Sequence, residues 1–312
     1  MPINSLDPKA DRTICIAGAS GFLGRAAVEK FSRHGYRVIA LIRPTSKSII
    51  PGVNSEVKQI RGTIQDWVAA IAAEKPSSVL SFDWSGVERE LRNDLVLQES
   101  NIDRVSRLAE AAVLAGATNF VSFGSQAEVR PSKHPILESA LDDPQSAYGS
   151  AKIAARNRIE LLLEGTDTRF TWGRIFTIYG PGDARESLIT QLIKSLLQNE
   201  SFAISEPSKR WSFLEINDFA DAIYVLNENP QPSGIINIGN SNFSTIGEVA
   251  DKIGKVLGLP RNILKSDDKA PESSQLSWIP DTSTLSSLSW APRVPLDAGL
   301  ENTVRWWKQL IN

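Results

Sequence analysis

The chain has 312 residues, enough for one large domain or two coupled domains with a substantial buried core. Lys and Arg total 34 and Asp and Glu total 36, so the net charge of -2 gives no indication of binding to nucleic acid or to an anionic membrane surface. The apolar segments are shorter than a membrane-spanning helix requires.

The cysteine and histidine content indicates the cellular compartment and bears on whether the chain binds a metal. Cys15 is the single cysteine and lies in an apolar run, so it cannot form an internal disulfide and fits a reducing compartment. Residues 1–12 lack the apolar region of a signal peptide. We therefore expect a cytoplasmic protein. The two histidines, His34 and His134, form no Cys/His cluster, and we expect no metal site.

A glycine-rich turn follows the first predicted strand, which is the apolar run 13–17. Residues 25–34 after the turn have helical spacing. In a strand–turn–helix unit such glycines permit a tight turn and let backbone N–H groups approach a pyrophosphate at the helix N-terminus. The spacing is G-x-x-G-x-x-G rather than the G-x-G-x-x-G of the archetypal motif. The cofactor-binding candidates in this turn are Gly18, Ser20, Gly21, Phe22, Leu23 and Gly24.

The second predicted strand, residues 37–42, ends at Arg43. NAD-binding versions of this unit carry an acidic residue there, which accepts hydrogen bonds from the adenosine ribose. No carboxylate is near Arg43 in the sequence, and an arginine suits a ribose 2′-phosphate. Alternatively, Arg43 is a solvated strand end without a ligand.

Further strands are predicted at residues 57–61, 78–83 and 119–123, and they alternate with helices. The helices are predicted at residues 67–73, 95–115 and 148–163. This alternation predicts an α/β fold with a doubly wound parallel sheet, as in Rossmann domains.

Tyr148 and Lys152 lie four residues apart, on one face of the last of these helices. An ammonium beside a phenol favours the phenolate, so we expect Lys152 to lower the pKa of Tyr148. A tyrosine in such a setting can transfer a proton to or from a substrate oxygen. The pattern Tyr-x-x-x-Lys also occurs on ordinary surface helices, so it indicates an active site only together with the other motifs.

Together these motifs resemble the extended short-chain dehydrogenase/reductase family, in the group of nucleotide-sugar epimerases, dehydratases and reductases. The resemblance covers residues 13–308 and implies that Ser125, Tyr148 and Lys152 are catalytic. It matches Asn101, less closely, to a helix asparagine that steadies the active site through water. It also implies an N-terminal cofactor domain of residues 1–176, to which 211–240 contributes, and a smaller substrate domain of residues 177–312.

The resemblance also implies a cofactor and partners. We expect NADP(H), with NAD as the alternative, and a nucleotide-sugar substrate. We also expect a homodimer, because the helices at 95–115 and 148–163 form a dimer interface in many relatives. The remaining cofactor-contact candidates are Thr63, Ile64, Phe82, Trp84 and Lys152. The substrate-contact candidates are Trp84, Gln126, Thr177 and Arg210, with Arg210 on the diphosphate.

Short motifs narrow the resemblance to the 4-ketoreductases of deoxysugar nucleotides, such as CDP-abequose synthases and dTDP-6-deoxyhexose reductases. The first alternative is a 4-epimerase or dehydratase, although common dehydratases have an acidic pair beside the catalytic Ser/Thr where this chain has Gln126. The second is a non-catalytic NADP-binding or scaffold protein. Arg174 is either a ligand contact or a tether for the end of the sheet. Four tryptophans are expected to bury a small C-terminal subdomain: Trp278, Trp290, Trp306 and Trp307.

Overall fold

The structure, a computed structural model, describes residues 12–46, 50, 57–198, 200–204, 206–259, 264–266 and 276–311. Most of the N-terminal stretch considered for a signal peptide therefore lies outside the described residues. A seven-stranded sheet has the order β11-β6-β5-β4-β1-β2-β3, and each pair of neighbouring strands is parallel. Its strands are β1 (Thr13–Ala17), β2 (Arg37–Ile42), β3 (Val57–Arg61), β4 (Ser78–Ser81), β5 (Asn119–Ser125), β6 (Arg169–Ile175) and β11 (Gly234–Ile238).

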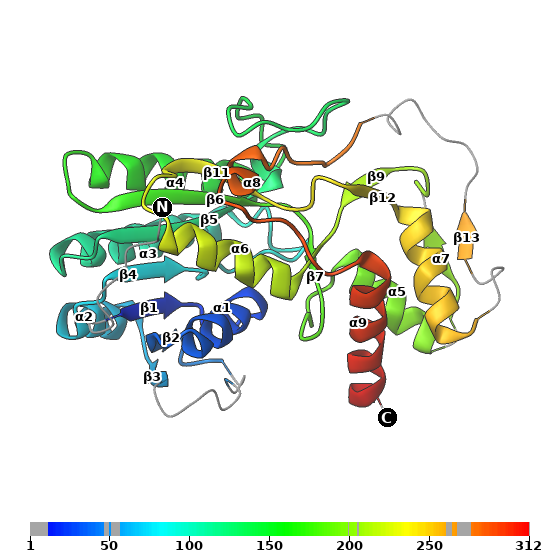
Figure 1. Ribbon diagram of the computed structural model, residues 1–312, viewed down its shortest axis with the longest axis horizontal. Helices are drawn as coiled ribbons and strands as arrows, with labels where there is room; N and C mark the ends of the chain where they lie inside the picture. Colours follow the sequence, from blue (N-terminus) through cyan, green and yellow to red (C-terminus); the bar gives the residue numbers. More distant parts are fainter. Residues whose placement is uncertain are drawn as a thin grey trace, which may run out of the picture.

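Helices cover both faces of this sheet, because successive side chains of its central strands point to opposite faces. Ile14 and Ile16 of β1 pack with α1 (Phe22–Arg33) and α6 (Ile216–Glu228), and Cys15 packs with helices on the other face. Those helices are α2 (Ile64–Glu74), α3 (Leu95–Leu114) and α4 (Ala147–Leu163). The predicted doubly wound α/β fold is confirmed (Figure 1).

The predicted elements of this half lie within a few residues of those observed. The fourth strand ends at Ser81, two residues earlier than predicted, so Asp83 belongs to the loop that follows it. The fifth strand continues to Ser125, which places this candidate catalytic residue at the strand's carboxyl end. Cys15 is a buried free thiol.

A second group of helices lies at one end of the molecule, to the right in Figure 1. It consists of α5 (Leu188–Leu197), α7 (Ile246–Leu257) and α9 (Leu296–Ile311), which share a separate hydrophobic core. The remaining helices are α8 (Ser283–Ser287) and the 3-10 turn η1 (Gln126–Glu128). The remaining strands pair in twos: β7 (Ile178–Tyr179) with β10 (Leu214–Glu215), β9 (Arg210–Ser212) with β12 (Phe243–Thr245), and β8 (Phe202–Ile204) with β13 (Leu264–Ser266).

The C-terminal tryptophans do not all serve the same core. Trp306 and Trp307 pack among α5, α7 and α9, as expected. Trp290 instead joins the cluster on the α1 and α6 face of the large sheet, so that part of the expectation is wrong. The chain crosses back to the sheet after α5, since β11 pairs with β6. The division at residue 176 stays a prediction.

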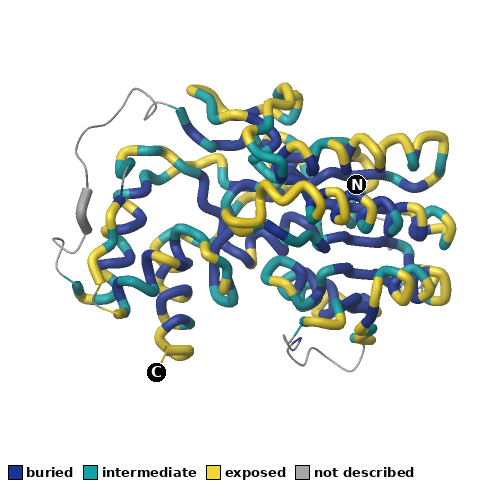
Figure 2. The backbone as a smooth tube through the Cα atoms, turned by 180° about the vertical axis from the view of Figure 1, so that it is seen from behind, coloured by how far each residue is buried: buried dark blue, intermediate teal, exposed yellow. Residues whose placement is uncertain are grey.

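The strand order reverses between β1 and β4, and ligands of open α/β sheets bind outside the carboxyl ends of the strands at such a point. Apart from the edge strand β3, the strands of the large sheet are mostly buried along their length, so the loops after them are the parts that can contact a ligand (Figure 2). Within the described part of the chain, no helix is long and apolar enough to cross a membrane.

Candidate active site

The glycine turn after β1 has the shape that a dinucleotide requires. Gly18 has φ +72°, and a Cβ there would lie 2.8 Å from the carbonyl carbon of Phe82. A Cβ on Gly24 would lie 2.2 Å from the Gly18 oxygen, so only glycine lets α1 start this close to the turn. Gly21 precedes α1 and provides no side-chain cap. The first N–H groups of α1 therefore fit a pyrophosphate. Phe22 and Leu23 pack on the core beneath, and Ser20 accepts a hydrogen bond from the Ser46 hydroxyl at 2.9 Å.

The end of β2 differs from the expectation. Asp83, which follows β4, supplies a carboxylate beside Arg43 that the local sequence lacks. Nε of Arg43 is 2.5 Å from Oδ1 of Asp83, and Nη1 donates to the Ser85 hydroxyl at 2.5 Å. The expectation that no carboxylate is near Arg43 is therefore wrong, because folding places Asp83 beside it. Arg43 is also not a solvated strand end without partners.

Thr63 and Ile64 form the start of α2, after β3. The backbone N–H and the hydroxyl of Thr63 both donate to Oδ2 of Asp66, at 2.7 and 2.8 Å. Thr63 therefore caps this helix, and contact of Thr63 and Ile64 with the cofactor stays a prediction.

The loop after β4 brings two aromatic candidates to the carboxyl edge of the sheet. Phe82 stacks on Phe123, with ring centroids 4.2 Å apart. Trp84 donates from Nε1 to Gln98 at 3.0 Å, and Nζ of Lys152 lies 3.6 Å from the centroid of the Trp84 ring. Trp84 therefore makes a cation–π contact with the candidate catalytic lysine.

Asn101 is on α3 and contacts the loop after β4, while its role through water stays a prediction. Its side chain is fully buried, accepts a hydrogen bond from the Ser85 N–H at 3.0 Å and donates to the Ser85 oxygen at 2.9 Å. Asn101 therefore fixes the loop after β4, and through it the position of Trp84.

The three candidate catalytic residues lie together. Ser125 ends β5, while Tyr148 and Lys152 lie one turn apart on α4. The Ser125 hydroxyl is close enough to the Tyr148 phenol to lower its pKa. Gly149 permits this approach, because a Cβ there would lie 2.2 Å from the Ala127 oxygen of η1.

The expectation that Lys152 lowers the pKa of Tyr148 is wrong, because that pKa is raised. Burial raises the pKa of the Tyr148 phenol, although the Ser125 hydrogen bond acts against this rise. Burial also lowers the pKa of Lys152 to about 7. Nζ of Lys152 donates to the Phe123 carbonyl at 2.7 Å instead of approaching the phenol oxygen. At neutral pH Tyr148 is consequently protonated and able to donate.

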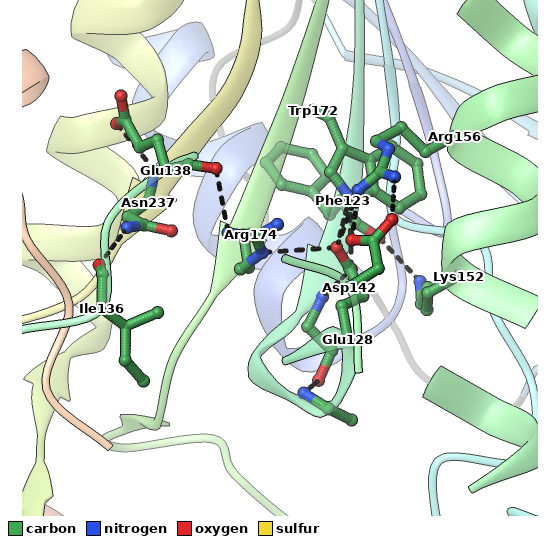
Figure 3. Close-up of polar contacts among 12 residues, drawn as sticks. Phe123, Glu128, Ile136, Glu138, Asp142, Lys152, Arg156, Trp172, Arg174 and Asn237 are labelled. Carbon is green, nitrogen blue, oxygen red and sulfur yellow. Dashed lines mark hydrogen bonds and ion pairs between the residues drawn. The ribbon is translucent and has the colours of Figure 1, made fainter. Parts of the chain in front are cut away.

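The buried carboxylate of Glu128 lies close to Arg174 and Arg156 (Figure 3). Glu128 is fully buried, and its Oε1 accepts a hydrogen bond from the Ser125 N–H at 2.6 Å. Its Oε2 lies 3.4 Å from Nε of Arg174 and 3.7 Å from Nη1 of Arg156. Burial raises the pKa of Glu128, and the two guanidiniums and the hydrogen bonds act in the opposite direction. A Cβ on Gly124 would lie 2.1 Å from Oε1, so glycine is needed to admit the carboxylate.

The same network decides the role of Arg174. This side chain is fully buried between Glu128 and the backbone oxygens of Leu137 and Glu138, as Figure 3 shows for the two glutamates. Of its two predicted roles, the structure supports that of a tether at the end of β6.

The candidate substrate residues are more dispersed. Gln126 begins η1, and its buried Oε1 makes no hydrogen bond within the described residues. The Thr177 hydroxyl accepts a hydrogen bond from Nε1 of Trp211 at 2.5 Å. The neighbouring Arg210 is exposed on the β9–β12 ribbon, with Cζ 5.1 Å from the centroid of Phe243. Binding of substrate by these residues stays a prediction.

Comparison with known proteins agrees with this geometry. The profile of the family described as "NAD dependent epimerase/dehydratase family" matches residues 14–239. The chain belongs to this family. It is therefore an enzyme of a group that uses a nicotinamide dinucleotide, and its extended short-chain dehydrogenase/reductase character is confirmed.

Among curated relatives, GDP-L-fucose synthase 1 of Arabidopsis thaliana is 23% identical, over 98% of this chain and 95% of its own length. The dTDP-6-deoxy-L-talose 4-dehydrogenase (NAD(P)(+)) of Kitasatospora kifunensis is 22% identical, over 91% and 92%. Among solved structures, the UDP-glucose 4-epimerase of Thermotoga maritima with UDP-glucose has a TM-score of 0.83 at 19% identity, over 96% of this chain and 100% of that one. MoeE5 with UDP-glucose and NAD has a TM-score of 0.82 at 22% identity, over the same shares. The two solved structures have the same fold as this chain.

Sequence reasoning missed several charged residues of the site. Asp83 carried a detectable signal, since a charged residue directly after a buried parallel strand lies at the ligand edge of the sheet. Glu128 completes a Ser-x-x-Glu capping box with Ser125, which is also visible in the sequence. Arg92 and Arg185, whose charges act on Tyr148, carried no such signal, because they lie in separate loops.

Proposed function

We propose that this protein is an NADP(H)-dependent reductase that acts on the 4-keto group of a nucleotide-linked 6-deoxy sugar. The observation that carries the proposal is the guanidinium of Arg43 at the end of β2, where an NAD-binding chain presents an acid. A cation at this place favours the 2′-phosphate of NADPH. An enzyme that takes up NADPH and releases NADP+ in each turnover works as a net reductase.

The chain's own residues supply the acid chemistry of such a reduction. In this proposal the substrate's keto oxygen accepts hydrogen bonds from the hydroxyls of Tyr148 and Ser125, which are close enough for Ser125 to act on the pKa of Tyr148. The nicotinamide, when bound, supplies a hydride to the carbonyl carbon. Tyr148 gives its proton to the oxygen, so that the ketone becomes a secondary alcohol. The Ser125 hydroxyl stabilises the developing oxyanion, which is worth about 10- to 1,000-fold in rate.

The protonated state of Tyr148 supports reduction as the first step. A ketone needs a proton donor, and a buried phenol with a raised pKa is one at neutral pH. Lys152, one helical turn away, keeps Nζ on the Phe123 carbonyl, and in this proposal it contacts the cofactor. In this proposal residues 1–176 bind the cofactor, residues 177–312 bind the sugar nucleotide, and 211–240 contribute to both.

The alternative is a nucleotide-sugar 4-epimerase or dehydratase, which the family assignment favours in general terms. A common dehydratase needs a carboxylate beside Ser125 that faces the substrate. Glu128 is the acid closest to Ser125 in the sequence after it, but its carboxylate is bound to the Ser125 N–H and two arginines beneath the site. This placement disfavours the dehydratase.

Thermal-shift measurements test the substrate class. With NADPH present, the melting temperature is measured with CDP-, dTDP-, UDP- and GDP-sugars, and the protein's own cofactor is assayed after dialysis. We expect one nucleotide class to raise the melting temperature and the cofactor to dissociate. NAD+ that cannot be removed by dialysis favours the epimerase. The homodimer stays a prediction, which light scattering tests.

A further inference from the structure

Two arginines share one buried carboxylate at the carboxyl edge of the sheet. Asp83 is almost fully buried, and each of its oxygens faces a different guanidinium. Oδ1 lies 2.5 Å from Nε of Arg43, and Oδ2 lies 2.8 Å from Nε of Arg104 on α3. The Ser85 hydroxyl lies between the two arginines, at 2.5 Å from Nη1 of Arg43 and 3.5 Å from Nη2 of Arg104.

The two arginines are held to different degrees. Arg104 bonds Asp83, the Asn101 amide oxygen at 2.6 Å and the Ser100 hydroxyl at 3.2 Å, so its nitrogens all have partners within this network. Arg43 uses Nε and Nη1 in the network, and its side chain is 35% exposed against 22% for Arg104. Arg43 is therefore the more accessible of the two cations.

The charges of this network determine what it can attract. Asp83 and Arg43 alone form a neutral pair, and a neutral pair gives little attraction for a phosphate. Arg104 adds a second positive charge against the same carboxylate, which leaves the three side chains with a net charge of +1. Arg61 donates to the Arg43 carbonyl at 3.4 Å, and the ion pairs of Asp83 among the described residues are those with Arg43 and Arg104.

We propose that Arg104 determines the specificity for the 2′-phosphate of the cofactor, by neutralising Asp83 so that the charge of Arg43 is left for the phosphate. Arg104 acts through Asp83 and Arg43, and it is a positioning residue rather than a direct ligand. This inference rests on the preference for NADPH in the proposed function. It assigns a role to a residue of α3 that the position of Arg43 alone does not imply.

The test compares two ligands that differ only in the 2′-phosphate. Isothermal titration calorimetry measures the Kd of 2′,5′-ADP and of 5′-AMP for the intact protein, without sugar nucleotide. We expect the wild type to bind 2′,5′-ADP about 10- to 100-fold more tightly. Arg104→Gln should reduce this ratio to within about threefold. Arg107→Gln removes the same charge one turn further along α3, without contact to Asp83, and should keep the wild-type ratio.

A second variant separates charge balance from mere structural support. Asp83→Asn with Arg104→Gln restores the net charge of +1, so the double variant should regain most of the wild-type ratio. Asp83→Asn alone leaves both arginines uncompensated and should show a ratio no lower than the wild type, which tests the idea even if Arg104→Gln does not fold. The inference is overturned if Arg104→Gln keeps the ratio, if the double variant does not regain it, or if Asp83→Asn loses it.

Failure of this inference can be distinguished from failure of the proposed function. A wild type that binds both ligands equally overturns this inference, whatever its activity on sugar nucleotides. A wild type that discriminates between them but reduces no keto sugar nucleotide refutes the proposed substrate and leaves the inference in place.

Discussion

Replacement of Glu128 by Gln tests the buried network beneath the catalytic group. The substitution keeps the shape and one amide oxygen, which can still accept from the Ser125 N–H, but it removes the carboxylate charge that forms an ion pair with the fully buried Arg174. Loss of one partner from a buried ion pair costs about 3–5 kcal/mol. Arg156 keeps Asp142 at 2.6 Å, so we expect the lower end, about 3 kcal/mol.

Chemical denaturation in urea measures the change in the free energy of unfolding, and the melting temperature should fall by roughly 6 °C for a chain of this length. Glu160→Gln is the matched control, because Glu160 also faces Arg156 but at 3.9 Å with 46% of its side chain exposed. That control should lose less than about 0.5 kcal/mol. Equal stability of the Glu128→Gln and Glu160→Gln variants would refute the idea that Glu128 compensates Arg174.

Three further substitutions test individual residues of the site. Tyr148→Phe should lower kcat by about a thousandfold or more and leave the calorimetric Kd of NADPH within about threefold, since it removes only the proton donor; turnover within about tenfold of wild type contradicts that role. Lys152→Met should raise the melting temperature most below pH 7, because the folded wild type holds a buried charge there. The gain in melting temperature should shrink as the pH rises towards 10, where the lysine of the unfolded chain also loses its proton. A gain that does not depend on pH contradicts the lowered pKa of Lys152. Arg210→Ala should weaken binding of the sugar nucleotide about tenfold or more without changing that of NADPH; an unchanged substrate Kd moves the diphosphate contact elsewhere.

The parts of the fold that sequence predicted are those decided by local pattern. The apolar runs of β1 and β2 and the glycines between β1 and α1 determine strand, turn and helix within about 30 residues. The Tyr148–Lys152 spacing likewise follows from helical geometry alone. These features needed no knowledge of distant contacts, and the fold class and the family could be predicted from them.

The features that escaped prediction depend on contacts between distant segments. Asp83 meets Arg43 across 40 positions, because the loops after β4 and β2 meet at the same edge of the sheet. Trp290 packs on the α1 and α6 face because the chain returns there before α9. The pKa of Tyr148 rises because burial outweighs the neighbouring charges, and burial is a property of the folded molecule.

Transfer of isotope from the cofactor tests the central claim most directly. The protein is incubated with a 4-keto-6-deoxy sugar nucleotide and NADPH deuterated at C4 on the face from which the hydride leaves, with the opposite face tested in parallel. Mass spectrometry then measures deuterium in the sugar, while absorbance measures NADPH consumption. We expect one NADPH consumed for each sugar and one deuterium at the sugar C4 with one of the two cofactors. Recovery of the keto sugar without deuterium and without consumption of NADPH would contradict the reductase, and conversion of a 4-hydroxy sugar nucleotide into its C4 epimer without net consumption of cofactor would identify an epimerase.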